Sequence, residues 1–404
     1  MATRSDQLAV FRRASFVFYV ASRFFSGVAL SLLRTAILWH VYDLSGSAFQ
    51  LGLIGLVQFL PALGLSLIGG AIADTHDRRR IAMIAQIAPL VCSAALCLAT
   101  LSGVVSLPII YALVFLVAVA TAFENPARMA LLPLLVPREM FPRAVTVHST
   151  VAAFSLGTGP VVMGFVSAWA GIGTAYAVHA ALMLASIGAL SRVTLLVPQS
   201  ERAAVTWRAI KEGVSFVRRT PVVLGCMTLD MFAVIFGGAV ALLPIYAKEI
   251  LEVGEFGYGL LAASFEIGAL MMSIVLVLAP TVQRAGRLLL VAVAVFGLAT
   301  IVFGFSRSFP LSIAAYMIVG MADQISVVMR STAIQLSTPD ALRGRVSSVN
   351  MIFIGASNQL GAVESGFVAA LTSATFAVVS GGVGCLIVLA IVALKLPELR
   401  RYRV

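Results

Sequence analysis

Charged residues are scarce in this sequence. Of its 404 residues only 11% are charged and 60% are hydrophobic, whereas soluble domains average about 25% charged residues. A soluble globular fold is therefore excluded, and lipid is the expected solvent for most of the chain. A net charge of +11 would indicate a nucleic-acid partner in a soluble protein. Here the basic residues lie in short loops, so no nucleic-acid partner is expected.

Cysteine and histidine are also rare, with four residues of each. Every cysteine lies inside an apolar run, and none has a second cysteine or a histidine at the spacing of a zinc site. We interpret all four cysteines as packing residues. No nucleophile motif or phosphate-binding glycine loop stands out. The sequence therefore predicts no metal site, no cofactor and no enzyme.

Long apolar runs take up most of the chain. A transmembrane helix needs about 20 mainly apolar residues, and no polar interval is long enough for a soluble domain. The predicted fold is an all-α membrane protein with twelve transmembrane helices. The spans are 14–41, 50–73, 80–101, 108–134, 144–169, 174–195, 221–247, 257–280, 287–305, 310–336, 346–371 and 374–396.

The basic residues predict the topology. Cytoplasmic loops of membrane proteins are enriched in Lys and Arg, and 22 of the 28 basic residues fall on one side of the predicted spans. An even number of spans places both termini on that side. The N-terminal stretch has no small-residue cleavage site after a short apolar core, which predicts a cytoplasmic tail. We expect a multi-pass inner-membrane protein with both termini in the cytoplasm.

The chain divides into two halves that repeat one another. The expected organisation is an N-terminal six-helix bundle over 1–197, a cytoplasmic linker with an interfacial helix over 198–220, and a C-terminal six-helix bundle over 221–404. The stretch from Arg128 aligns without a gap on the stretch from Arg330, an offset of 202 residues that also matches Gly159 with Gly361. Two parallel repeats of this kind are typical of transporters with a site between their halves.

The motif GAIADTHDRRR at 70–80 resembles the loop between the second and third spans of the major facilitator superfamily. Asp77 stands where that signature usually has a second glycine. Other stretches, among them ENPARMALLPLLVP and MRSTAIQLSTPDALRGRVSSVN, resemble the drug-efflux branch that includes the enterobactin (siderophore) exporter. The resemblance covers nearly the whole chain and implies the two-bundle fold of that superfamily.

Two motifs take expected roles from this resemblance. The first is a cytoplasmic latch, in which charge-assisted contacts hold one conformational state; its residues are Gly70, Asp74, Arg78, Arg79 and Arg80. The alternative is that its arginines only set topology. The second partly resembles the glycine-proline signature of antiporters and comprises Gly157, Gly159, Pro160 and Gly164. Here the alternative is ordinary close packing of helices.

Several charged residues fall inside the predicted spans, where a charge at the bilayer centre costs at least about 2.5–3.5 kcal/mol. We expect the cavity and substrate site to include Arg23, Arg34, Glu124, Arg128, Asp323 and Arg330. Glu124 and Arg128 are four residues apart and within pairing reach. Asp323 and Arg330 share a helix face two turns apart. Both sets could instead be buried structural pairs.

Three other carboxylates are candidates for proton coupling. Asp230, Glu266 and Glu364 have no basic residue within a turn on their own predicted helix. Burial disfavours an ionised carboxylate and a nearby arginine favours it, so alternating exposure could load and release a proton. The predicted function is proton-coupled efflux of a small amphiphilic molecule, a drug or a siderophore, by a monomer in the lipid bilayer. The alternatives are an importer, an uncoupled facilitator or a non-transporting membrane sensor.

Overall fold

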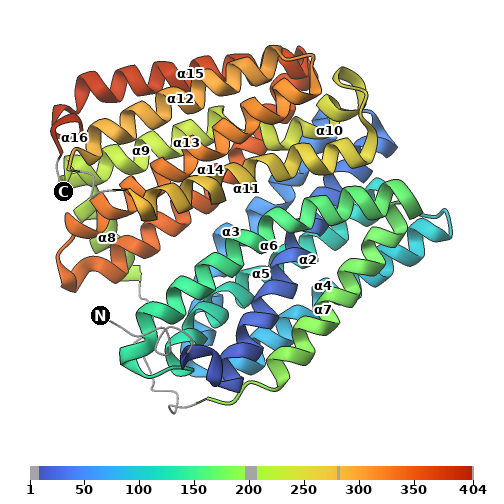
Figure 1. The fold of residues 1–404 in the computed structure, drawn as a ribbon, viewed down its shortest axis with the longest axis horizontal. Coiled ribbons are helices and arrows are strands. Elements are labelled where there is room, and N and C mark those ends of the chain that lie inside the picture. The colour runs from blue at the N-terminus through green and yellow to red at the C-terminus, as the bar shows by residue number, and fades with distance from the viewer. Residues whose placement is uncertain (1–8, 196–206, 280–282, 403–404) are drawn as a thin grey trace. The chain divides into compact units, whose positions relative to one another are not determined.

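The computed structural model describes residues 9–195, 207–279 and 283–402 (Figure 1). Side chains at 9, 62–64, 66–75, 138, 207–210 and 341 also lie outside the described set. All regular elements in the described ranges are helices. Those of the first half are η1 (Ala9–Arg12), α2 (Ala14–Ser45), α3 (Ala48–Thr75), α4 (Arg78–Leu101), α5 (Leu107–Leu131), η2 (Leu132–Leu134), η3 (Arg138–Met140), α6 (Phe141–Ala170) and α7 (Ile172–Ser191).

The second half begins after a short amphipathic helix, α8 (Trp207–Arg219). It contains α9 (Pro221–Phe236), η4 (Ala239–Leu242), α10 (Leu243–Ile245), η5 (Tyr246–Ile250), α11 (Gly254–Leu278), α12 (Ala285–Phe305), α13 (Phe309–Leu336), η6 (Asp340–Leu342), α14 (Arg343–Leu371), α15 (Ala374–Lys395) and α16 (Pro397–Arg401). The segments from α9 to η5 form one membrane-crossing stretch, Pro221–Ile250.

Ten helices in the described residues are long and apolar enough to cross a membrane. The two other predicted spans also form long helices, α3 and α14. The described side chains of α3 give an apolar stretch only over Ala48–Pro61. α14 carries Asn358, Gln359 and Glu364 among its apolar residues, which lowers its mean hydropathy. At a rise of 1.5 Å per residue, a 28-residue helix is roughly 42 Å long, which is enough to cross the bilayer.

The chain forms two compact units, residues 1–40 with 60–205 and residues 41–59 with 206–404. Residues 41–59 of the predicted N-terminal bundle and residues 207–220 of the predicted linker both belong to the second unit. Phe49 contacts Phe367, with ring centroids 4.7 Å apart, and Lys248 Nζ lies 2.5 Å from Asp43 Oδ1. The end of α2 and the beginning of α3 are therefore held by α14 and by η5, which is a π-helix.

The two units repeat the same helix neighbours. In the first unit α4 packs against α5 and α7, and in the second α12 packs against α13 and α15. The apolar core at one end of the first unit joins Phe16 and Tyr19 of α2 to Leu131 of α5 and Leu190 of α7. The amphipathic helix α8 lies on α14, and Gly213 faces the backbone carbonyl of Arg345 there.

Small residues allow close helix contacts at matching places in the two halves. A Cβ on Gly159 of α6 would lie 2.7 Å from backbone atoms of Val28 and Leu32 of α2. A Cβ on Gly361 of α14 would lie 2.7 Å from the Val234 carbonyl oxygen of α9. Of the other antiporter-like residues, Pro160 and Gly164 are buried and Gly157 is half-buried. Close packing therefore accounts for the two aligned glycines.

Replacing Gly361 with alanine should destabilise the protein, because the new methyl group collides with backbone that cannot rotate away. Overpacking of this kind costs about 1–3 kcal/mol. The matched control is Gly355→Ala on the same helix, where a Cβ meets nothing within 4 Å and removal of a helical glycine contributes about 0.5–1 kcal/mol of stability. Thermal unfolding of the purified variants tests this. Equal midpoints for the two variants would contradict the packing argument.

Candidate functional site

The first unit contains a buried ion pair on one face of α5. Arg128 Nη2 lies 2.7 Å from Glu124 Oε1, and Arg128 Nε donates to the same oxygen at 3.1 Å. Gln86 Nε2 of α4 donates to that oxygen at 2.9 Å. Arg128 and Glu124 are only 4% and 9% exposed. The predicted i, i+4 pair is confirmed, and the charge of Arg128 is neutralised within its own helix.

The second unit neutralises the corresponding arginine in another way. Arg330 of α13 forms its ion pair with Asp230 of α9, and both residues are less than 9% exposed. The alternative interpretation, in which Arg330 forms a buried pair with Asp323, is therefore wrong. Seven residues of helix separate those two side chains by about 10 Å along the axis, whereas Asp230 approaches Arg330 from a neighbouring helix.

Asp323 instead interacts electrostatically with Glu266 of the neighbouring helix α11. No described basic side chain forms an ion pair with Asp323. The two helices approach closely at this level, because Gly320 of α13 faces the backbone of Phe265 and Gly268 of α11 faces the backbone of Met317. Two carboxyl groups that are 57 residues apart in the chain thus lie on adjacent helices and influence one another electrostatically.

The remaining predicted residues do not join these groups. Glu364 of α14 is half-buried, and Ser365 Oγ lies 3.4 Å from its Oε2. Arg34 of α2 is exposed. Arg23, three turns earlier on the same helix, lines a pocket inside the first unit together with Glu124.

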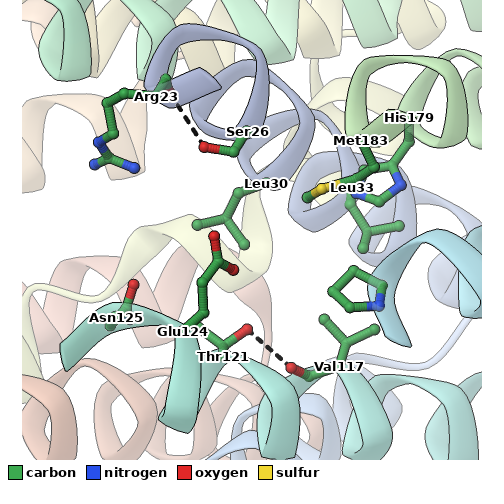
Figure 2. Close-up of a pocket in the computed structure, with 11 residues that line it drawn as sticks. Arg23, Ser26, Leu30, Leu33, Val117, Thr121, Glu124, Asn125, His179 and Met183 are labelled. Atoms are coloured by element: carbon green, nitrogen blue, oxygen red, sulfur yellow. Dashed lines mark hydrogen bonds between the residues drawn. The ribbon is translucent and has the colours of Figure 1, made fainter. Parts of the chain in front are cut away.

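This pocket is enclosed by α2, α4, α5 and α7 (Figure 2). Arg23, Glu124 and Asn125 lie on the left of the view, with Leu33, Val117 and Met183 on the right. Ser26, Leu30, Pro89, Thr121 and His179 complete the lining. The cavity has a volume of about 20 Å³, which is room for about one water molecule.

Sequence reasoning missed two polar residues of this region. His179 is fully buried, and neither of its ring nitrogens has a hydrogen-bond partner in the described part of the chain. Gln86 is also fully buried and binds Glu124. Each is a single polar residue inside an apolar span. The sequence could have indicated a role for it only through the free-energy cost of burying a polar group.

Part of the predicted cytoplasmic latch lies in the described residues. Asp77, the departure from the superfamily signature, accepts hydrogen bonds from the backbone N–H groups of Arg79 and Arg80 and caps the N-terminus of α4. A carboxylate at this position satisfies two donors that the helix leaves free. Gly70 and Asp74 belong to α3, but their side chains lie outside the described set.

The three latch arginines differ in their contacts. Arg78 donates to the Ala130 carbonyl of α5 at 3.3 Å. Arg79 donates to the carbonyls of Ser191 and Val193 at 2.8 and 2.5 Å, at the end of α7, where carbonyl groups lack helical partners and attract cations. The Arg80 side chain is 79% exposed. Arg78 and Arg79 therefore join three helix ends of the first unit.

The described residues contain no group of three or more His, Cys, Asp and Glu arranged to hold a metal ion. All four cysteines are free thiols. Cys92, Cys226 and Cys385 are buried and Cys97 is half-buried. The candidate functional groups of the described residues are therefore two buried ion pairs, two interacting carboxyl groups and a small polar pocket.

Residues 5–402 match the model of a family described as transmembrane secretion effector. The chain belongs to this family of the major facilitator superfamily. Its relatives include the enterobactin exporter EntS of Escherichia coli O1:K1 / APEC and that of Escherichia fergusonii. Each is 25% identical over 383 residues, covering 95% of this chain and 92% of the relative.

Solved transporters share the fold of this secretion-effector chain. A POT family transporter in complex with 5-aminolevulinic acid has a TM-score of 0.74 at 11% identity and covers 95% of this chain and 96% of its own. The nucleoside transporter NupG has a TM-score of 0.73 at 11% identity, covering 96% and 99%. A bacterial homologue of the human lysosomal transporter Spinster has a TM-score of 0.72 at 14% identity, covering 99% of each chain. The protein is a multi-pass membrane transporter with a major facilitator fold, not an enzyme.

Asp230→Asn should strongly destabilise this secretion-effector family member, because it leaves Arg330 buried without a counter-charge. Breaking a buried pair from one side costs about 3–5 kcal/mol, and the double variant Asp230→Asn/Arg330→Gln should recover part of that loss. Thermal unfolding measures both. The control Asp340→Asn removes an exposed pair with Arg343, which contributes about 0–1 kcal/mol. Additive losses in the double variant would argue against direct coupling.

Arg79→Gln should lower stability by about 1.5–3 kcal/mol, the contribution of hydrogen bonds made by a charged donor. Arg80→Gln is the matched control, because the Arg80 side chain next to Arg79 in the chain is exposed and does not bind the end of α7. The unfolding midpoint is the measurement. If the two variants unfold together, the arginines act through topology rather than by binding the end of α7.

Proposed function

We propose that this transporter exports a small amphiphilic molecule, a drug or a siderophore, in exchange for protons. It would act as a monomer in the inner membrane, with both termini in the cytoplasm. The excess of Lys and Arg on one side of the spans supports the orientation. The relatives that match nearly the whole chain are named as enterobactin exporters, which supports the direction and makes enterobactin the first substrate to test.

The observation that carries the proton coupling is the electrostatic interaction between Glu266 and Asp323 on the adjacent helices α11 and α13; we refer to these two residues as the carboxyl pair. Two interacting carboxylates repel, and one bound proton relieves that repulsion. The basic residue on the same helix, Arg330, is already bound to Asp230. The Glu266–Asp323 pair is therefore better suited to bind and release a proton than Asp230, which we assign a structural role. Glu364 remains a second candidate.

The proposed cycle uses the charge of this pair. With a proton bound, the pair has one negative charge fewer and costs less to bury. Loss of that proton to the cytoplasm adds a charge and disfavours the dehydrated state. Alternation between states in which the pair faces one side or the other would then couple inward proton movement to outward movement of substrate.

Export should therefore depend on both members of the pair. Enterobactin or the dye ethidium would be added as transport probe outside everted membrane vesicles that have an imposed pH gradient. We expect Glu266→Gln and Asp323→Asn each to reduce proton-driven uptake into the vesicles by about tenfold or more. Exchange of substrate without a gradient should persist, because the proton step is bypassed.

Glu398→Gln is the control, since this carboxylate is exposed on α16. Normal gradient-driven transport by both pair variants would refute the assignment of Glu266 and Asp323 and direct attention to Glu364. Transport in the opposite direction, driven by the same gradient, would identify an importer. Equal transport with and without the gradient would identify an uncoupled facilitator.

A further inference from the structure

The pocket in the first unit contains a carboxylate oxygen that no described side chain binds. All three donors that reach Glu124, two from Arg128 and one from Gln86, bind its Oε1. Glu124 lines the pocket, and its Oε2 has no hydrogen-bond partner among the described residues. The pocket thus offers a strong acceptor, and an occupant that donates a hydrogen bond would satisfy it.

The same pocket offers donors that also lack partners. Arg23 makes no side-chain hydrogen bond or ion pair with a described residue, and its Nε is buried. Its charge is in excess here, because the charges of Arg128 and Glu124 cancel. Asn125 lies at the same side of the pocket (Figure 2) and has an exposed amide. An occupant that accepts a hydrogen bond would satisfy one of these groups.

His179 adds a buried polar group that faces the pocket. It is fully buried on α7, with both ring nitrogens unpartnered in the described residues. A buried polar group without a partner is costly, and an imidazole can donate from one nitrogen and accept at the other. The two hydroxyl groups of the lining, Ser26 and Thr121, already donate to backbone carbonyls.

We propose that this pocket binds a hydroxyl group, phenolic or alcoholic, of the transported amphiphile; the assignment of the occupant as substrate rests on the function proposed above. The hydroxyl donates its hydrogen to Glu124 Oε2, and its oxygen accepts from Arg23 or His179. A carboxylate would be repelled by Glu124, because it brings a second negative charge and no proton to donate. An ether would leave Oε2 unsatisfied.

The size of the pocket limits what enters. Space for about one water molecule admits a hydroxyl group but no ring. Leu30 and Asn125 are the exposed residues of its lining. The apolar body of the ligand would remain outside, against Leu30, so the pocket selects the polar end of an amphiphile and leaves its body to other contacts.

Three probes with one shared tail test this on the intact protein: 4-butylphenol, 4-butylanisole and 4-butylbenzoate. Binding to the protein in nanodiscs is measured by isothermal titration calorimetry, with empty nanodiscs as the blank for partitioning. We expect saturable binding of the phenol and about tenfold or greater weakening for the ether, which loses one hydrogen bond to a charged group. The benzoate should bind no better than the ether.

Arg23→Gln tests the donor side. It should weaken the phenol by about tenfold, because the ligand oxygen loses a donor, while Arg12→Gln, an exposed arginine of the same unit, leaves phenol binding unchanged. Equal affinity for phenol and ether, or tightest binding of the benzoate, would overturn the hydroxyl assignment. Proton-driven export by the wild type, measured separately in vesicles, keeps the two proposals apart: selective binding without export leaves the site standing and rejects the function.

Discussion

A charge inside the membrane must be neutralised close to where it lies. The bilayer offers no water to solvate a guanidinium or a carboxylate, so each costs several kcal/mol unless a partner is within hydrogen-bond reach. Arg128 and Arg330 occupy equivalent positions in the two halves, and each binds one carboxylate in its own unit. Which helix supplies each of these two carboxylates determines which other polar groups are left near each arginine.

The difference between the halves follows from this choice of partner. Arg128 takes its carboxylate from its own helix, which leaves one oxygen of Glu124 for the pocket beside Arg23. Arg330 takes its partner from α9, which leaves Asp323 of its own helix to the neighbouring Glu266. One repeated arginine therefore leaves a hydrogen-bonding pocket in the first unit and a carboxyl pair in the second.

Local patterns in the sequence were sufficient for much of this architecture. Apolar runs located the helices to within a few residues, as for α12, predicted over 287–305 and observed over Ala285–Phe305. The four-residue spacing of Glu124 and Arg128 predicted their pair because a helix brings such positions together. The repeat predicted that Gly159 and Gly361 would play equivalent parts, and both allow a close helix contact.

Contacts between helices could not be predicted in the same way. Asp230 and Arg330 are 100 residues apart, and nothing in either segment specifies the other as its partner. The same holds for Glu266 with Asp323 and for Gln86 with Glu124. His179 gave no pattern at all, because a single polar residue in an apolar helix acquires meaning only from the residues packed around it. The packing of separate helices, which is a property of the folded chain, determines these pairs.

Arg330 has its counter-charge in Asp230, and we propose that Glu266 and Asp323 are thereby left to carry a proton. Infrared spectroscopy of the purified protein at neutral pH tests it directly through the absorption of protonated carboxyl groups. The account predicts a band that is lost or shifted in both Glu266→Gln and Asp323→Asn and retained in Asp230→Asn. A band that persists unchanged in both pair variants, or that disappears only in Asp230→Asn, would contradict it.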